Sequence, residues 1–118
     1  MQAVSNIARY DRQNRIEGWD QEKLEKARIG IIGSGPLAQM TALPLAALGF
    51  GHIEIYDVSK FAKRSRQDFV CARAKRGTDK IQSLETMLKR VNPNVNAKGI
   101  NLCIYQGSQD SMFNSLDL

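Results

Sequence analysis

The apolar residues of this chain fall into short runs whose spacing alternates between that of a strand and that of a helix. Compact runs at residues 29–33 and 52–56 predict two strands, of which the first is apolar enough to be buried in a parallel sheet. Between them, residues 36–48 are predicted to form a helix, with Pro36 at its first position and Gly49 directly after its last. The order of strand, helix and strand predicts a βαβ unit.

The pattern continues beyond the second strand. Apolar side chains recur at helical spacing over residues 79–90, with Thr78 as the expected cap. This helix must end before Pro93, because the residue before a proline is disfavoured in helical conformation. We expect a third strand over residues 95–102 and the start of another helix over residues 108–116.

The start of the chain carries weaker signals. Residues 7–15 are polar and have no clear periodicity, whereas Asp20 is expected to cap a short helix that ends near Lys26. We therefore divide the chain into an N-terminal segment with a short helix, residues 1–27, and a partial nucleotide-binding domain, residues 28–118. The expected fold class is α/β, a Rossmann-like parallel sheet of which only the first βαβαβ half is visible.

The turn between the first strand and the helix carries the predicted chemistry. Gly33 permits a tight turn, Gly35 lets a phosphate approach bare backbone, and the small Ala38 lets the helix pack on the strand. Asp57 ends the second strand, where a carboxylate can accept hydrogen bonds from a ribose diol. These four residues are the predicted nucleotide-binding residues; the alternative is a glycine turn that binds no nucleotide.

Charge is concentrated in one segment of a chain whose formal net charge is +5. Residues 60–80 hold eight basic and two acidic side chains. The segment follows the carboxyl end of the second strand, where ligands of open α/β sheets bind, so it suits a polyphosphate. A solvated loop face and a nucleic-acid patch are the alternatives, and we do not expect a nucleic-acid partner.

The remaining composition excludes several classes of protein. The chain has 118 residues and no apolar run near the ~20 needed to span a bilayer, and its first residues lack the features of a signal peptide. We expect a cytoplasmic protein with no membrane partner. Cys71, Cys103 and the single His52 suggest neither a disulfide framework nor a metal site.

Five motifs, in their order and spacing, together resemble those of one protein family. They are Arg9-Tyr10-Asp11-Arg12-Gln13, the glycine turn with Asp57, Arg66-Gln67, Gly77-Thr78-Asp79-Lys80 and Val91-Asn92-Pro93. The combination resembles the ThiF/MoeB/HesA family, which includes the ubiquitin-activating enzymes, over residues 9–104. The resemblance implies that the C-terminal carboxylate of a ubiquitin-like or sulfur-carrier protein attacks the α-phosphate of ATP, forming an acyl-adenylate and releasing pyrophosphate.

The resemblance also implies roles for three cationic residues. Arg12 falls where the family has an arginine that reaches the triphosphate, often that of the partner subunit in a homodimer or heterodimer. Arg66 and Lys80 fall on two phosphate contacts. Preorganised cations stabilise the charge that builds on the α-phosphoryl group and the departing pyrophosphate, so we predict these three as catalytic residues. The implied cofactor is ATP with Mg²⁺, although the usual magnesium-binding aspartate is absent from this chain.

Departures from the family pattern keep two other functions open. Pro36 and Ala38 stand where family members have glycine, and the segment between Asp57 and Gln67 is shorter than usual. An NAD-dependent oxidoreductase domain is one alternative, and a non-catalytic partner subunit of a heterodimeric activating enzyme is the other. We expect this chain alone to be inactive in ATP–pyrophosphate exchange and to self-associate through its uncovered sheet.

Overall fold

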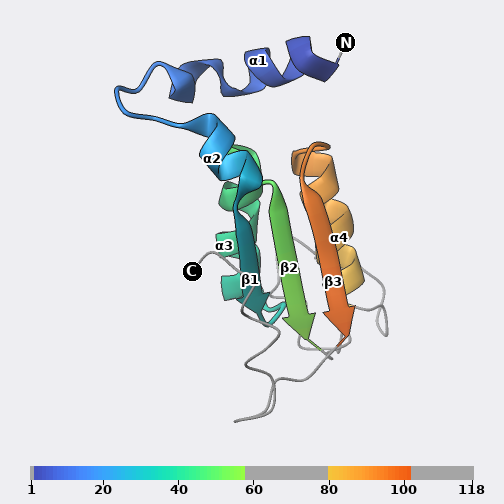
Figure 1. Cartoon of the computed structure of the whole chain (residues 1–118). Helices are drawn as coiled ribbons and strands as arrows, with labels where there is room; N and C mark the ends of the chain where they lie inside the picture. Colours follow the sequence, from blue (N-terminus) through green and yellow to red (C-terminus); the bar gives the residue numbers. More distant parts are fainter. Residues whose placement is uncertain (1, 58–79, 102–118) are drawn as a thin grey trace.

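The computed structural model describes residues 2–57 and 80–101, which form one layer of helices on a three-stranded parallel sheet (Figure 1). The elements in chain order are α1 (Gln2–Asn14), α2 (Gln21–Lys26), β1 (Arg28–Ile32), α3 (Pro36–Leu48), β2 (His52–Asp57), α4 (Lys80–Val91) and β3 (Asn96–Asn101). The strand order is β1-β2-β3 and both pairs are parallel, which confirms the predicted α/β fold. The predicted helix over residues 108–116, both cysteines and nearly all of the basic segment lie outside the described residues.

Local signals explain the bounds of the central helix. α3 begins at Pro36, where the missing N–H costs no helical hydrogen bond, and ends at Leu48. Gly49 follows in the left-handed conformation, with φ at 100°, and its N–H returns to the carbonyl oxygens of Ala46 and Leu45. The predicted bounds of this helix are confirmed residue for residue.

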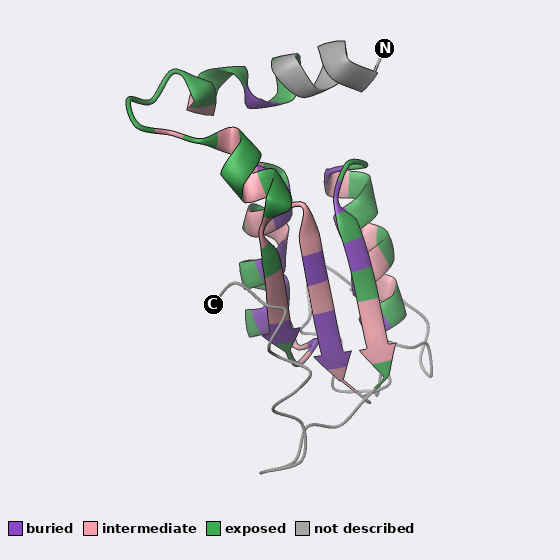
Figure 2. Ribbon diagram, viewed as in Figure 1, coloured by how far each residue is buried: buried purple, intermediate pink, exposed green. Residues whose placement is uncertain are grey.

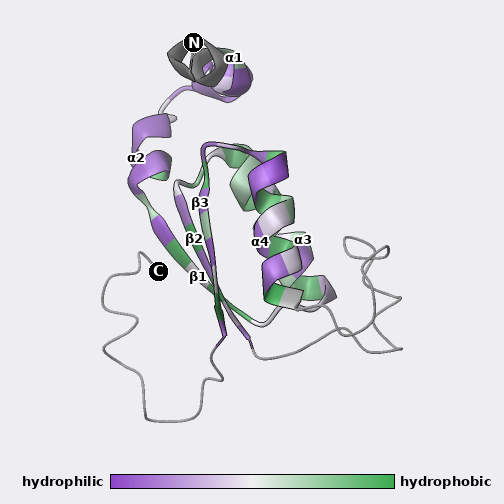
Figure 3. Cartoon of the chain, turned by 90° about the vertical axis from the view of Figure 1, so that its right-hand side faces the viewer, coloured by the Kyte–Doolittle hydropathy of each residue, from purple (hydrophilic) through white to green (hydrophobic). Residues whose placement is uncertain are grey.

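The core lies between the sheet and the two helices α3 and α4, which cover the same face (Figure 3). Alternation along β2 turns Ile53 and Ile55 toward these helices, and both are fully buried. Figure 2 shows buried positions in each of the three strands. The other buried members of this layer are Ile31, Ala38, Ala42, Ala46, Ile81, Leu84, Leu88, Val95 and Ala97. Small alanines on α3 allow that helix to approach the strands closely.

The opposite face of the sheet is polar at its amino end. Register places Arg28, His52 and Asn96 in one row across the three strands, with Glu54 and Lys98 in the next. No helix of the described residues covers this face (Figure 3). The prediction that β1 is a buried strand is therefore wrong in part: Ile31 alone is buried, and Ile32 is 65% exposed.

Helix α1 covers most of residues 7–15, the polar segment in which the sequence has no clear periodicity. It lies at the amino end of the sheet (Figure 1), across the points where α3 and α4 end. Arg9 Nη1 donates to the carbonyl oxygen of Val91 at 3.0 Å, and Gln13 Nε2 donates to that of Leu48 at 2.6 Å. Such carbonyls lack partners within their own helix, so polar side chains satisfy them. Hydrogen bonds from polar side chains therefore contribute to the docking of α1.

A buried hydrogen-bond network completes this docking. Tyr10 is 3% exposed, and its hydroxyl oxygen accepts from Asn92 Nδ2 at 2.7 Å. Asn92 Nδ2 also donates to the carbonyl oxygen of Ala46 at 2.8 Å, and Asn92 Oδ1 accepts from the N–H of Asn94 at 3.1 Å. Asn92 thus ties α1, α3 and the turn after α4 together. We call Arg9, Tyr10, Gln13 and Asn92 the α1 clamp.

The short helix α2 joins this region to the sheet as predicted. Its cap is Asp20, whose carboxylate accepts from the N–H of Lys23 at 3.2 Å. The N–H of Gly51 donates to the carbonyl oxygen of Leu24 at 3.1 Å. A side chain at Gly51 would collide with the backbone of Glu25, so the two segments touch through backbone alone. The boundary after residue 27 stays a prediction.

The outer edge of β3 is closed by a side chain from α4. Glu85 Oε2 accepts from the N–H of Gly99 at 2.9 Å. Burial acts to raise the pKa of Glu85, but hydrogen bonds from Lys89 and from Gly99 outweigh it, so the pKa lies below its ordinary value. The carboxylate is therefore charged at neutral pH. None of the described helices is long and apolar enough to cross a membrane.

Candidate functional site

The glycine turn sits at the carboxyl end of the sheet, between β1 and α3. Gly33 has φ at 104°, a conformation that other residues rarely adopt, and its N–H donates to the carbonyl oxygen of Tyr56 at 2.8 Å. Gly35 is the residue before α3, in an extended conformation with φ at −77°. The two glycines therefore do different things: Gly33 permits the turn, whereas Gly35 needs no special backbone angle.

Space is left open above both glycines. A Cβ atom at Gly33 or Gly35 would meet no atom within 4 Å among the described residues. The turn borders an open hollow of about 340 Å³, and its walls include Ile32, Pro36 and Leu37. The N–H groups of Leu37 and Ala38 fall in the first helical turn, where they have no partner within the helix and favour an anion. The hollow is thus chemically suited to a phosphate.

Asp57 ends β2 beside this turn and is half-buried. The hydroxyl of Ser34, in the middle of the turn, donates to Asp57 Oδ2. Gln39 of α3 supports the turn from the core side, since its Nε2 donates to the carbonyl oxygen of Ser34 at 3.1 Å. The predicted Gly33, Gly35, Ala38 and Asp57 therefore share one end of the sheet.

Sequence reasoning missed Ser34 and Gln39. Ser34 is 1% exposed and Gln39 is fully buried. A signal was present for Gln39, because it is a long polar residue near the start of an otherwise apolar helix. A buried amide requires hydrogen-bond partners, so such a residue points to a backbone group that needs support. No comparable signal marked Ser34.

The three predicted cationic residues have different positions. Arg12 lies on α1 at the amino end of the sheet and is exposed. α3 separates the α1 clamp from the glycine turn, and its 13 residues span about 20 Å, far beyond the reach of an arginine side chain. Lys80 is the first residue of α4, near the carboxyl end of β3, and its side chain lies outside the described part. Arg66 also lies outside it.

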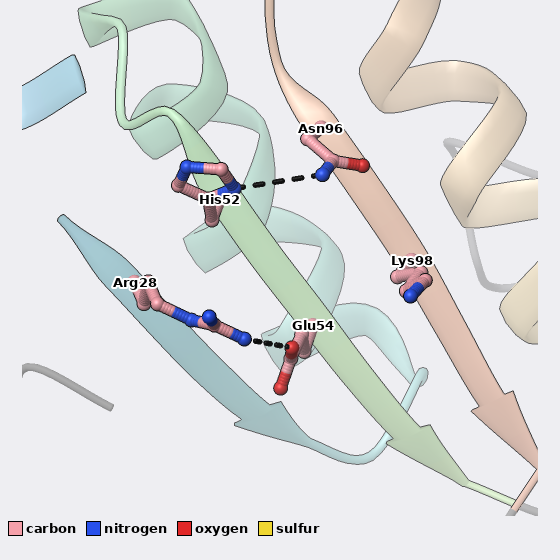
Figure 4. A pocket seen from close by; sticks show the side chains of 5 residues that line it. All are labelled: Arg28, His52, Glu54, Asn96 and Lys98. Carbon is pink, nitrogen blue, oxygen red and sulfur yellow. Dashed lines mark hydrogen bonds and ion pairs between the residues drawn. The ribbon is translucent and has the colours of Figure 1, made fainter. Parts of the chain in front are cut away.

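A second hollow, of about 210 Å³, lies on the polar face of the sheet (Figure 4). Its lining residues are Arg28, His52, Glu54, Asn96 and Lys98. Arg28 Nη2 and Glu54 Oε1 form an ion pair at 3.0 Å. Charges of both signs face one another here, so the hollow has no strong preference for an anion or a cation.

Tyr56 follows His52 and Glu54 along β2, closer to the glycine turn. Its hydroxyl donates to Glu54 Oε2 at 2.6 Å. This hydrogen bond is the main reason that the pKa of Glu54 lies below its ordinary value, with Arg28 adding to the effect against burial. Burial, followed by the bond to Glu54, raises the pKa of Tyr56 to about 12. Both groups therefore keep their ordinary charge states near neutral pH.

The geometry defines a class of protein. A parallel βαβ unit with a glycine turn at the start of its helix, and an acid at the end of its second strand, is a Rossmann-type unit, an arrangement that binds nucleotides in many proteins. Residues 10–118 match the ThiF family. The chain therefore belongs to the ThiF family.

Curated relatives are similar over most of this chain. The molybdopterin-synthase adenylyltransferase of Haemophilus influenzae is 32% identical over 98 residues, which are 79% of this chain and 40% of the relative. A probable adenylyltransferase/sulfurtransferase, MoeZ of Mycobacterium tuberculosis, is 33% identical over 117 residues, which are 95% of this chain and 30% of the relative. The chain thus spans between 30% and 40% of the length of these two relatives.

Solved structures share the fold at lower sequence identity. The crystal structure of Escherichia coli MccB with ATP has a TM-score of 0.68 and 23% identity, covering 73% of this chain and 26% of MccB. The crystal structure of PaaA has a TM-score of 0.75 and 22% identity, covering 86% of this chain and 35% of PaaA. At this level of identity the similarity establishes the fold alone.

Proposed function

We propose that this chain forms the ATP-binding part of a ThiF/MoeB-type adenylyltransferase that activates the C-terminus of a ubiquitin-like or sulfur-carrier protein. The observation that carries the proposal is the open turn at Gly33 and Gly35, with Asp57 beside it, in a chain of the ThiF family. Two of the relatives that are similar to this chain are called adenylyltransferases. The ribose would lie near Asp57 and the phosphates above the turn.

In this proposal the chain contributes binding and charge rather than a nucleophile. The N–H groups of Leu37 and Ala38 would face the phosphates at the positive end of the α3 dipole. The attacking group is the carboxylate of the carrier protein, which would displace pyrophosphate from the α-phosphorus. Backbone donors and cations held in place would stabilise the charge of that transition state.

Two of the predicted cationic residues follow β2 in the sequence, and we assign them to the triphosphate. We propose that Arg66 and Lys80 bind phosphate oxygens, whereas Lys60, Lys63 and Lys75 face water. Removing the charge at either of the first two should weaken ATP binding, and removing it at the other three should change it little, because exposed charges contribute little. Calorimetry on the five alanine variants tests this ranking, and the reverse order would refute it.

Mg²⁺ is proposed to accompany ATP, where it would neutralise charge on the phosphates. Within the described ranges, no three side chains of the His, Cys, Asp or Glu type gather to hold a metal ion. We therefore assign it no residue here, and the proposed roles of the turn and of Asp57 do not depend on it.

Arg12 supports the proposal that two chains act together. The α1 clamp holds this arginine at the end of the sheet opposite the turn. For Arg12 to reach a triphosphate without the clamp opening, the triphosphate must belong to another chain. We propose a homodimer, or a heterodimer with another activating subunit, in which Arg12 serves the neighbouring site.

Gly35 offers the sharpest test of ATP binding. Its φ of −77° suits any residue and its Cβ position is open, so Gly35→Ala and Gly35→Val should leave the fold intact. If phosphates approach this backbone, ATP affinity should fall in order of side-chain size. Calorimetry with ATP and with NAD measures this, and urea unfolding verifies equal stability. Full ATP affinity in Gly35→Val, or tighter binding of NAD than of ATP, would refute the proposal.

A further inference from the structure

Two buried polar side chains join the glycine turn to the acid at the end of β2. Ser34 is 1% exposed and Gln39 is 0% exposed. Burying a hydroxyl or an amide costs free energy unless hydrogen bonds replace those to water. Packing of α3 on the sheet does not explain these residues, because its alanines already provide that contact.

The hydrogen bonds form a continuous path from α3 to Asp57. Gln39 Nε2 donates to the carbonyl oxygen of Ser34 at 3.1 Å, and the Gln39 N–H donates to the carbonyl oxygen of Gly35 at 3.0 Å. The Ser34 hydroxyl then donates to Asp57 Oδ2. From the other side, the Gly33 N–H is bonded to the carbonyl oxygen of Tyr56, directly before the acid.

We infer that Ser34 and Gln39 are positioning residues for Asp57, and that they make the site selective for ribonucleotides over 2′-deoxyribonucleotides. This inference rests on the proposed binding of ATP. Gln39 fixes the backbone of Ser34, and the Ser34 hydroxyl fixes one oxygen of the Asp57 carboxylate.

Chemistry explains why a fixed carboxylate selects the sugar. An ionised carboxylate can accept about four hydrogen bonds through its two oxygens, so a bond from Ser34 is compatible with further bonds from a ribose diol. A group that is already held in place loses less conformational freedom when the ligand binds. A sugar without its 2′-hydroxyl makes fewer hydrogen bonds to Asp57. Holding the carboxylate in place therefore raises its affinity less than it raises that of a ribose.

A double-mutant cycle tests the inference. Affinities for ATP and 2′-deoxyATP are measured by calorimetry for the unmodified chain and for the variants Ser34→Ala, Asp57→Ala and the double substitution. We expect the unmodified chain to prefer ATP, and Ser34→Ala to weaken ATP binding by about three- to tenfold while changing 2′-deoxyATP binding by less than about twofold. In the Asp57→Ala background, Ser34→Ala should have no further effect on the ratio of the two affinities.

Two more variants separate positioning from general damage. Gln39→Met keeps the length of the side chain but removes the donor, and it should shift the ATP preference in the same direction by a smaller factor. Thr86→Ala is the matched control, because Thr86 Oγ1 donates to the carbonyl oxygen of Gln82 at 3.0 Å on the exposed side of α4. It should leave both affinities unchanged.

Each contrary result has its own meaning. Equal losses for the two nucleotides in Ser34→Ala and Gln39→Met would overturn the inference, since they would reveal a structural role only. An undiminished effect of Ser34→Ala in the Asp57→Ala background would overturn it too, because Ser34 would then act independently of the acid. An unmodified chain that binds neither nucleotide would refute the proposed function itself.

Discussion

Asn92 joins helix α1 to α3 and to the turn after α4, and the cost of its loss can be worked out from its hydrogen bonds. The side chain is fully buried and takes part in three hydrogen bonds, with Tyr10, Ala46 and Asn94. A typical hydrogen bond contributes about 1 kcal/mol net, so Asn92→Ala should lower the free energy of unfolding by about 3 kcal/mol. In this variant the carbonyl oxygen of Ala46 still accepts a hydrogen bond from the N–H of Gly49, so it is not left without a partner.

Tyr10→Phe isolates one of these bonds. It removes the hydroxyl that accepts from Asn92 but leaves the buried ring, so we expect a loss of about 1 kcal/mol. Because the two side chains share this bond, the double variant should be less destabilised than the sum of the single variants, by about 1 kcal/mol. Asn101→Ala, at the exposed end of β3, is the control and should stay within about 0.5 kcal/mol of the unmodified chain.

Urea unfolding followed by two signals provides the measurement. Trp19 is the single tryptophan of the chain, and its Nε1 donates to Gln21 Oε1 at 2.9 Å. Gln13 of the clamp donates to the same oxygen, so Trp19 lies beside the clamp. Its fluorescence reports on the docking of α1 and α2, and far-ultraviolet circular dichroism reports on the whole chain. If Asn92→Ala unfolds within about 0.5 kcal/mol of the unmodified chain, or if no coupling with Tyr10→Phe is found, the clamp does not hold α1 as described.

Three further outcomes follow from other features. Mixing an Arg12→Ala chain with a Gly35→Val chain should restore ATP binding to part of the sites if Arg12 acts on a neighbouring chain, whereas either variant alone should bind weakly in calorimetry. Above pH 10 the unfolded chain gives up the Tyr56 proton before the folded chain does, so the stability of the folded state should fall between pH 10 and about 12. Urea titrations across that range should show a shallower fall for Tyr56→Phe, and an equal fall would refute this. Gly51→Ala should destabilise the chain in the same assay, because its Cβ collides with the Glu25 backbone, whereas Gly35→Ala should not.

Elements with local signals could be predicted from the sequence. Pro36 and Gly49 mark the two ends of α3, and Pro93 requires α4 to end before it. The helix expected over residues 79–90 is observed as Lys80–Val91, and the strand expected over residues 52–56 as His52–Asp57. In each case the signal is local: a proline or glycine marks the end of the element, or apolar residues recur at the spacing of a helix or a strand. Such elements can be predicted without knowing which distant residues they contact.

Contacts between distant residues explain what could not be predicted. Helix α1 docks through pairs that are 82 positions apart, Arg9 with Val91 and Tyr10 with Asn92, and no local periodicity encodes them. In the candidate site, the glycine turn and Asp57 were predicted from their spacing, but the bond from Ser34 to Asp57 was not. Their roles in binding remain predictions, because they concern a ligand rather than the fold.

The bond between Glu85 and the outer N–H of Gly99 occupies one backbone donor at the outer edge of β3. A charged acceptor occupies the edge of β3, so an additional strand would have to compete with it there. At the other edge, Ile32 of β1 lies exposed, and the same residue forms part of the wall of the hollow at the glycine turn. A strand that joins the sheet beside β1, from any polypeptide, would therefore reshape the hollow at the glycine turn as it binds. Assembly and ligand occupancy would then be linked through one shared side chain.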